Sequence, residues 1–294
     1  MTPAGLAAKF RFGDISPILS LLFLLYLSVA AHATEVLFYA PLPMENSSVT
    51  QARNQPLADL LSKLLGREVR LRLVADHASS LDALAAGQVH FAELGPLPFL
   101  LARERVADLL PLATFRESDG RADYRCVIVA PMDGVAALTD LIGAEAAVSV
   151  ALTRPQSTCG PAATFSILGE LGLNLSEVTV SYQGGHSDVA VAVLREQFLI
   201  GGVKESFAHS FHGLGLRVLA ASEPVPGFVL LVRAGLLDNQ QWQSLSRALS
   251  ELDEAGLQQL QNGRHGFAPF EEQRFDAVNA MRRLADRSVQ RVTE

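Results

Sequence analysis

The sequence contains few of the motifs from which enzymes are built. Its 294 residues include two cysteines, Cys126 and Cys159, and no Cys-x-x-Cys pair. The Gly-x-Ser-x-Gly turn of many hydrolases and the His-Glu-x-x-His motif of zinc proteases are also missing. His209 and His212 have i, i+3 spacing, but no carboxylate pattern accompanies them, so they are interpreted as surface or core histidines. The sequence therefore predicts no catalytic residue, no metal site and no cofactor.

Basic runs, internal repeats and low-complexity tracts are absent as well. The chain carries 24 lysines and arginines against 31 acidic residues, a formal net charge of −7. An acidic chain without a basic run binds the nucleic-acid backbone poorly, which argues against a nucleic-acid partner. No segment after residue 33 is long and apolar enough to cross a membrane. We expect a soluble rather than a membrane-spanning protein.

The N-terminal segment has the order of a cleavable signal peptide. Lys9 and Arg11 precede an uncharged, leucine-rich stretch at 15–29, and Ala-His-Ala at 31–33 supplies small residues for cleavage. The apolar stretch is shorter than the roughly 20 residues that a spanning helix needs. Cleavage removes two cations and one anion, which changes the net charge from −7 to −8. We expect a periplasmic mature protein that begins at Thr34, without a cysteine there to carry a lipid anchor.

Short apolar strands alternate with helical segments along the rest of the chain. Such alternation is typical of doubly wound α/β folds. After the signal peptide at 1–33, the pattern predicts a first lobe at 34–122, a second lobe at 123–220, and a return to the first lobe with a helical C-terminal tail at 221–294. Each lobe is expected to be a doubly wound sheet with flanking helices. Clefts between lobes are common ligand sites.

The predicted elements include helices at 55–65, from Ser79 or Ser80 to Ala86, at 161–171 and at 187–195, and a strand at 124–130. Side chains at i and i+2 of a strand share a face, so Tyr124 and Cys126 are expected to point the same way. Arg125 is expected to alternate away from that face.

Two predicted helix starts carry groups that suit an anion. Ser-Thr-Cys-Gly at 157–160 precedes Pro161, a favoured first helical residue, and Gly-Gly-His at 184–186 precedes the helix at 187–195. Free backbone N–H groups and the positive end of the helix dipole point out of such starts. Two hydroxyls stand beside the first start and a protonatable histidine belongs to the second. Either segment alone is compatible with a plain capped helix, but together they indicate an oxyanion site.

Four segments, in this order, resemble the phosphonate/phosphite family of periplasmic binding proteins. They are AELGPLPFLLA at 92–102, YRCVIVA at 124–130, STCGPAATFSILGELGL at 157–173 and GGHSDVAVAVLREQ at 184–197. The likeness spans nearly the whole mature chain. It implies a two-lobed periplasmic binding protein of type II, and binding rather than catalysis.

The resemblance also implies ligand-binding roles for particular residues. The family's Ser-Thr-Ser-Gly turn and histidine hold the ligand's oxygens, and they correspond to Ser157, Thr158 and His186 here. A family tyrosine at the lobe crossing corresponds to Tyr124, and a first-lobe tyrosine is replaced by His77. The carboxylates that recognise an amino group in aminoalkylphosphonate binders are missing, so such a ligand is not expected.

Both cysteines depart from this family pattern. Cys159 replaces the second serine of the turn, and Cys126 replaces a serine two residues after Tyr124, so both are expected to face the cleft. A thiol at a helix start has a lowered pKa and is a soft ligand, which resembles the arsenite-binding sensory members of the family. The motifs aim no arginine or lysine into the pocket, which a neutral arsenic hydroxide as the ligand would explain. In an oxidising compartment an even pair also favours a disulfide, so free thiols and a disulfide both stay open.

The sequence therefore predicts a periplasmic solute-binding protein that captures a small oxyanion in the cleft between its lobes. The ligand is phosphonate-like or phosphite-like, or is arsenite held by a pocket cysteine, and the partner is an ABC transporter permease or a histidine-kinase sensor. The expected ligand-binding residues are His77, Tyr124, Cys126, Ser157, Thr158, Cys159 and His186. The alternative from another class is a thiol-dependent periplasmic enzyme, which turnover by the purified protein would reveal.

Overall fold

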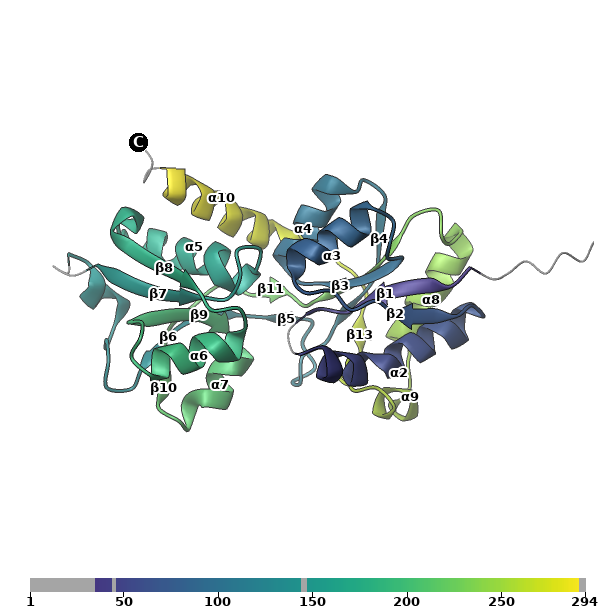
Figure 1. Ribbon diagram of the computed structural model, residues 1–294, viewed down its shortest axis with the longest axis horizontal. Helices are drawn as coiled ribbons and strands as arrows, with labels where there is room; N and C mark the ends of the chain where they lie inside the picture. Colours follow the sequence, from purple (N-terminus) through teal and green to yellow (C-terminus); the bar gives the residue numbers. More distant parts are fainter. Residues whose placement is uncertain (1–34, 44–45, 144–146, 291–294) are drawn as a thin grey trace, which may run out of the picture. The chain divides into compact units, whose positions relative to one another are not determined.

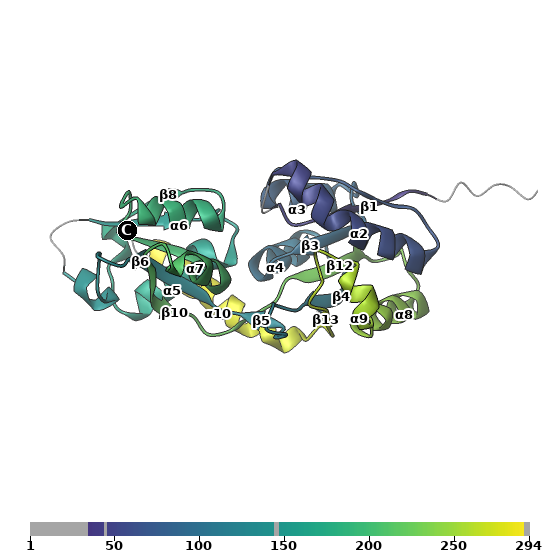
Figure 2. The same cartoon turned by 90° about the horizontal axis from the view of Figure 1, so that it is seen from below.

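The computed structural model describes residues 35–43, 46–143 and 147–290, so the predicted signal peptide lies outside the described residues. The described chain forms two α/β lobes, each built on its own sheet (Figure 1, Figure 2). No helix in these ranges combines the length and the apolar character needed to cross a membrane.

The first lobe contains a six-stranded sheet in the order β13-β4-β12-β3-β1-β2. Its strands are β1 (Leu37–Ala40), β2 (Val69–Leu71), β3 (Phe91–Leu94), β4 (Leu109–Phe115), β12 (Val229–Arg233) and β13 (Phe267–Ala268). β1 runs parallel to β2 and β3, whereas β12 is antiparallel to β3 and β4. The late strand β12 is therefore central to the first sheet, so the chain completes this lobe only after passing through the second.

Helices cover both faces of the first sheet. They are α2 (Ser47–Leu65), α3 (His77–Ala85), α4 (Pro96–Arg105), α8 (Asn239–Ser250) and α9 (Glu254–Gln258). Leu84 of α3 and Phe99 of α4 belong to one buried apolar cluster, and Leu57 of α2 and Leu249 of α8 belong to another. All four side chains are fully buried. Each such burial stabilises the fold by about 1.5–3 kcal/mol.

Two helices of this lobe begin earlier than the sequence indicated. α2 begins at Ser47 rather than at residue 55, because the Asn46 side chain caps its N-terminus. Pro56 therefore lies within the helix and not at its start. α3 begins at His77, since the carboxylate of Asp76 accepts a hydrogen bond of 2.7 Å from the Ser79 N–H. Aspartate is a strong N-cap, and it places His77 in the first turn of α3.

The second lobe contains a five-stranded sheet in the order β10-β6-β9-β7-β8. Its strands are β6 (Cys126–Pro131), β7 (Val148–Leu152), β8 (Val178–Tyr182), β9 (Ile200–Lys204) and β10 (Leu216–Ala221). Helix α5 (Ala163–Glu170) joins one apolar cluster, and α6 (His186–Leu194) and α7 (Glu205–His212) join the cluster on the other face. Helices on both faces of each sheet confirm the predicted α/β class.

Short strands β5 (Asp123–Tyr124) and β11 (Val225–Pro226) pair antiparallel where the chain passes between the lobes. The predicted strand at 124–130 is thus interrupted at Arg125, because β5 pairs with β11 whereas β6 pairs with β9 and β10. The expectation that Tyr124 and Cys126 share one strand face is wrong, since the two residues belong to different sheets.

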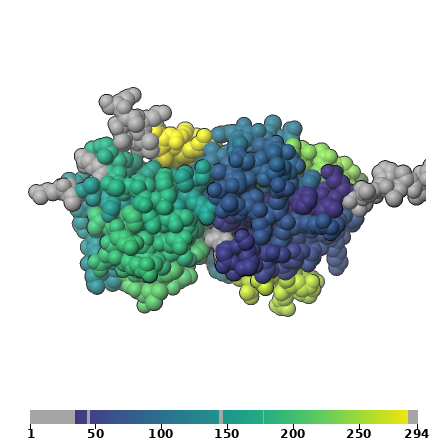
Figure 3. Space-filling model, viewed as in Figure 1, coloured from purple at the N-terminus to yellow at the C-terminus, as the bar shows by residue number. Residues whose placement is uncertain are grey.

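The C-terminal helix α10 (Asp276–Gln290) contacts α5 of the second lobe as well as α4 of the first. It is the yellow segment beside the teal residues in Figure 3. Val278 and Met281 pack in the same apolar cluster as Ala163 of α5 and Phe99 of α4. The tail that was expected to follow the return to the first lobe therefore joins both lobes through one apolar cluster.

Candidate functional site

A cavity of about 750 Å³ is lined by residues of both lobes and of the crossing strands. Six of the seven predicted site residues line it: His77, Tyr124, Ser157, Thr158, Cys159 and His186. Cys126 does not belong to the lining in the described structure and is 1% exposed. The volume lies within the range of small-molecule sites, so the cavity can hold a tetrahedral anion together with a substituent.

The turn after β7 brings three hydroxyl groups to one end of the cavity. They belong to Thr153, Ser157 and Thr158, each less than 10% exposed. The chain coils irregularly over Thr158–Ala162 before α5 begins, so the regular helix starts at Ala163 and not at Pro161. A Cβ on Gly160 would lie 2.8 Å from Thr153 Oγ1 and 3.0 Å from the Arg154 carbonyl oxygen. Glycine is therefore required for the turn to close over the Thr153 hydroxyl.

Some polar atoms at this end have no protein partner. Among the described residues, neither Thr153 Oγ1 nor His77 Nδ1 makes a hydrogen bond, although both atoms are buried. Thr158 Oγ1, by contrast, accepts a hydrogen bond of 3.0 Å from the Leu97 N–H in the first turn of α4, and it also bonds to the hydroxyl of Tyr124. Buried polar groups nearly always have partners, so the unpaired atoms point to a ligand with oxygens.

His186 presents a single N–H group to the cavity. Its Nδ1 accepts a hydrogen bond of 3.1 Å from the Lys204 backbone N–H, so the neutral ring carries its proton on Nε2. Its ring stacks on Phe207 with centroids 4.9 Å apart. Burial, followed by the charges of Lys204 and His77, lowers the pKa of His186 to about 3. The sequence suggested a protonatable donor here, but His186 is a neutral donor with a fixed tautomer.

His77 is neutral for a similar reason. Burial, followed by the nearby charge of Arg154, lowers its pKa to about 4, against a smaller opposing effect of Asp76. Arg154 donates hydrogen bonds of 3.2 Å to the carbonyl oxygens of Gly184 in the second lobe and Ala75 in the first. We call the group formed by Thr153, Ser157, Thr158 and His186 the oxyanion end of the cavity. Its hydroxyl and imidazole donors can hold the oxygens of an anion without proton transfer.

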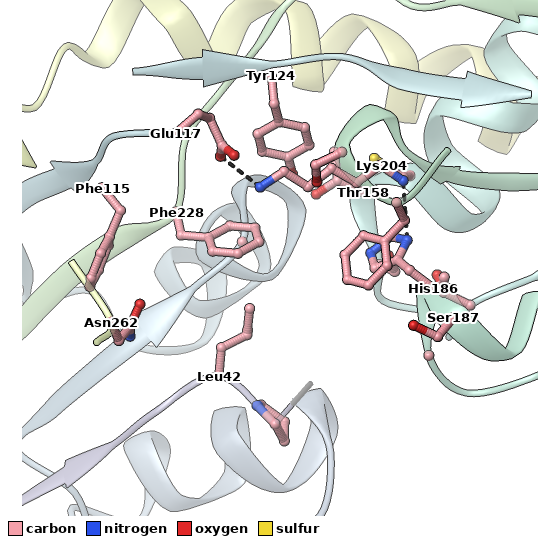
Figure 4. A pocket seen from close by; sticks show the side chains of 18 of the residues that line it. Leu42, Phe115, Glu117, Tyr124, Thr158, His186, Ser187, Lys204, Phe228 and Asn262 are labelled. Atoms are coloured by element: carbon pink, nitrogen blue, oxygen red, sulfur yellow. Dashed lines mark hydrogen bonds and ion pairs between the residues drawn. The ribbon is translucent and has the colours of Figure 1, made fainter. Parts of the chain in front are cut away.

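Arginine and lysine side chains line the pocket, although none of them belongs to the sequence motifs. The described lining contains the cations Arg53, Arg116, Arg154, Lys204 and Arg264 and the carboxylates Glu117 and Asp188. Lys204 Nζ lies 2.6 Å from Glu117 Oε1 and between the rings of Tyr124 and Phe228 (Figure 4). Arg53 belongs to helix α2, and the other cations come from loops and strand ends; all of them lie outside the segments that carry the family resemblance.

Cys126 and Cys159 form a disulfide, with Cα atoms 4.9 Å apart. It joins the start of β6 to the turn that carries Ser157 and Thr158. Both sulfurs are therefore bonded to each other, and neither is a thiolate that could bind arsenic or attack a substrate. The sequence left free thiols and a disulfide open, and the structure contains the disulfide. Cys126 and Cys159 therefore cannot act as thiol ligands in this state. The alternative of a thiol-dependent enzyme loses its basis for the same reason.

The lining residues that reasoning from the sequence missed include Thr153, Glu117 and Lys204. Thr153 follows β7 directly and Lys204 ends β9, positions at which α/β sheets commonly present ligand-binding side chains. A lysine after the apolar run of β9 is also unusual in a chain with three lysines in total. That signal could have identified Lys204, whereas Glu117 lies in a loop whose position no local pattern predicts.

Comparison with known proteins agrees with this architecture. The family described as "ABC transporter, phosphonate, periplasmic substrate-binding protein" matches residues 39–279. The phosphate-import protein PhnD of Mycolicibacterium smegmatis is 29% identical over 170 residues, which are 54% of this chain and 52% of that protein. The chain thus spans about half the length of this curated relative.

Solved structures share the fold at low sequence identity. A binding-protein component of an ABC phosphonate transporter from Pseudomonas aeruginosa has a TM-score of 0.73 at 17% identity, covering 88% of this chain and 89% of that one. PhnD1 from Prochlorococcus marinus, in complex with methylphosphonate, has a TM-score of 0.73 at 15% identity, covering 86% and 99%. These similarities confirm the predicted two-lobed type II fold. Because the family match extends over most of its length, the chain belongs to the phosphonate family of periplasmic substrate-binding proteins of ABC transporters.

Proposed function

We propose that this protein captures a small tetrahedral oxyanion of the phosphonate, phosphite or phosphate type and delivers it to the permease of an ABC importer. The observation that carries the proposal is the oxyanion end, where buried hydroxyls of Thr153, Ser157 and Thr158 gather with the neutral N–H group of His186. Thr153 Oγ1 makes no hydrogen bond within the described protein, and an anion oxygen would satisfy it.

The electrostatics of the lining favour an anion over a neutral ligand. Arg154 lies at the oxyanion end, where its guanidinium group donates hydrogen bonds to two backbone carbonyls. The neutral state of His77 and His186 means that donors and fixed guanidinium charges, rather than titrating groups, would hold the ligand. Charge-assisted hydrogen bonds of this kind contribute about 1.5–3 kcal/mol each, so three at the upper end of this range reach the roughly 8 kcal/mol of micromolar affinity.

The disulfide argues against arsenite as the ligand of the oxidised protein, because an As–S bond needs a thiolate. The matching family is described as a transporter component, so we propose an importer permease and not a histidine kinase as the partner. Export by the segment at 1–33 completes the proposal, since it delivers the chain to the oxidising compartment in which a disulfide persists.

Titration calorimetry of the purified mature protein tests the proposal. Phosphate, phosphite and methylphosphonate are compared with sulfate and arsenite, first in the oxidised protein and then with a reductant. We expect one site per chain with micromolar or tighter affinity for at least one of the phosphorus oxyanions. Absence of binding to all three phosphorus compounds, or tight arsenite binding by the oxidised protein, would contradict the proposal.

A further inference from the structure

Beside the oxyanion end, the cavity contains a buried cation that the protein itself supplies. Lys204 is 7% exposed, and its ammonium group lies 2.6 Å from Glu117 Oε1. The same nitrogen is 4.5 Å from the ring centroid of Tyr124 and 4.6 Å from that of Phe228 (Figure 4). We call Glu117, Tyr124 and Phe228 the cation cage. A carboxylate and two aromatic faces are the groups that recognise an alkylammonium ion.

The cage adjoins the oxyanion end through shared residues. The face of Tyr124 contacts the ammonium group, whereas its hydroxyl bonds to Thr158 of the oxyanion end. The backbone N–H of Lys204 also fixes the ring of His186. A ligand whose oxygens contact Thr158 and His186 would therefore direct its substituent along Tyr124 toward the cage.

We propose that Lys204 is a specificity-determining residue that excludes ligands with a cationic substituent, because its own ammonium group fills the cation cage. An incoming ammonium group would meet a like charge and would find Glu117 already paired. A phosphonate with a small uncharged substituent meets no such opposition. This inference rests on the proposed function, since it concerns the substituent of the ligand that the oxyanion end holds.

A matched pair of ligands tests the cage. Propylphosphonate and 2-aminoethylphosphonate have the same chain length and differ only in a terminal methyl or ammonium group. In the wild type we expect propylphosphonate to bind at least about tenfold more tightly, because the cage is occupied. In Lys204→Ala the cage is open and Glu117 is unpaired, so the ratio of the two dissociation constants should shift by about a hundredfold and favour the amino compound.

Two control variants separate the cage from a general loss of charge. Lys204→Met fills the same space with an uncharged chain, so it should shift the ratio far less than Lys204→Ala. Lys204→Ala/Glu117→Gln opens the cage but removes its carboxylate, so the gain in 2-aminoethylphosphonate affinity should largely disappear. An equal ratio in the wild type and Lys204→Ala, or a wild type that already prefers 2-aminoethylphosphonate, would overturn the inference.

A measurement without any phosphonate keeps the cage distinct from the proposed function. Propylammonium chloride should raise the melting temperature of Lys204→Ala, because the ion replaces the missing ammonium group, and it should leave the wild type unchanged relative to sodium chloride. A Lys204→Ala chain too unstable to purify alone should fold in its presence. If no variant binds a phosphonate but propylammonium still stabilises Lys204→Ala, the proposed function is wrong, whereas the inference that the cage binds an ammonium group is supported. If propylammonium stabilises neither, the cage is wrong.

Discussion

The two ends of the cavity differ in how their polar groups are satisfied. At the oxyanion end, Thr153 Oγ1 is buried and lacks a partner within the described residues. In the cation cage, the ammonium group of Lys204 is paired with Glu117 and flanked by two aromatic rings. In the proposed function, unpaired buried donors bind the ligand, whereas the paired ion excludes ligands with a cationic substituent. One cavity would then contain both an attractive and a repulsive determinant of specificity.

Removing the disulfide should produce the largest effect, and the effect should be greater at the oxyanion end than in the cation cage. Cys126 and Cys159 are 33 residues apart, and loop closure of that size stabilises a fold by about 3–4 kcal/mol. In Cys126→Ser/Cys159→Ser we expect a loss of that order in the free energy of unfolding and a weaker affinity for methylphosphonate. The ratio of the propylphosphonate and 2-aminoethylphosphonate dissociation constants should change less than the methylphosphonate affinity, because Cys126 pairs with Lys204 through the backbone of β6 and β9 and neither cysteine belongs to the cation cage.

Chemical denaturation and calorimetry measure these two effects. Wild-type protein with a reductant provides the control and should resemble the double variant. A double variant as stable as the oxidised wild type would show that the turn at 157–160 does not depend on its link to β6.

Loss of the Thr158 hydroxyl should weaken binding by about a hundredfold. In Thr158→Val the ligand loses a donor, the Leu97 N–H loses its acceptor, and Tyr124 loses a hydrogen-bond partner, effects of about 1–3 kcal/mol for each group left unpaired. Calorimetry with methylphosphonate gives the measurement. Thr179→Val, at an exposed position of β8, is the matched control and should bind as the wild type does. Similar methylphosphonate affinities for the two variants would show that the ligand does not bind at Thr158.

The acid sensitivity of the ligand-free fold should reflect His77 and His186. Their pKa values, about 4 and about 3 when folded, lie below the unfolded value of about 6.5, so the unfolded chain binds more protons between these limits. Their contribution to stability is therefore complete above pH 6.5 and is lost as the pH falls toward 4. We expect a loss of roughly 1–2 kcal/mol per histidine between pH 7 and pH 5.

Melting temperatures at pH 7 and pH 5 measure this loss. His77→Gln/His186→Gln should show a smaller decrease than the wild type over the same interval. An equal decrease in both proteins would mean that other groups control acid unfolding.

Replacing the His186 ring alone should have the smallest effect on binding. His186→Phe retains stacking on Phe207 but loses the neutral N–H donor, so methylphosphonate affinity should fall by about tenfold. His209→Phe, at an exposed position of α7, is the control and should leave the affinity unchanged. A loss beyond a thousandfold would indicate a charged donor and would contradict the neutral ring inferred from its Nδ1 contact.

Reasoning from the sequence predicted the fold class well because periodicity and turn residues are local. It failed where tertiary contacts determine the strand boundaries. At Arg125, for example, β5 ends because it pairs with β11, and β6 begins because it pairs with β9. The oxyanion end was largely predictable, since Ser157, Thr158 and His186 belong to recognisable helix starts. The cage was not, because Glu117 and Lys204 are 87 residues apart and only the folded chain pairs them.

A crystal structure of the protein with methylphosphonate tests the central claim most directly. The account predicts the phosphonate oxygens within hydrogen-bond distance of Thr153 Oγ1, Thr158 Oγ1 and His186 Nε2, with the methyl group directed toward Tyr124 and with Lys204 still paired to Glu117. A phosphonate bound elsewhere, or one whose oxygens contact Lys204 Nζ in place of His186, would contradict it.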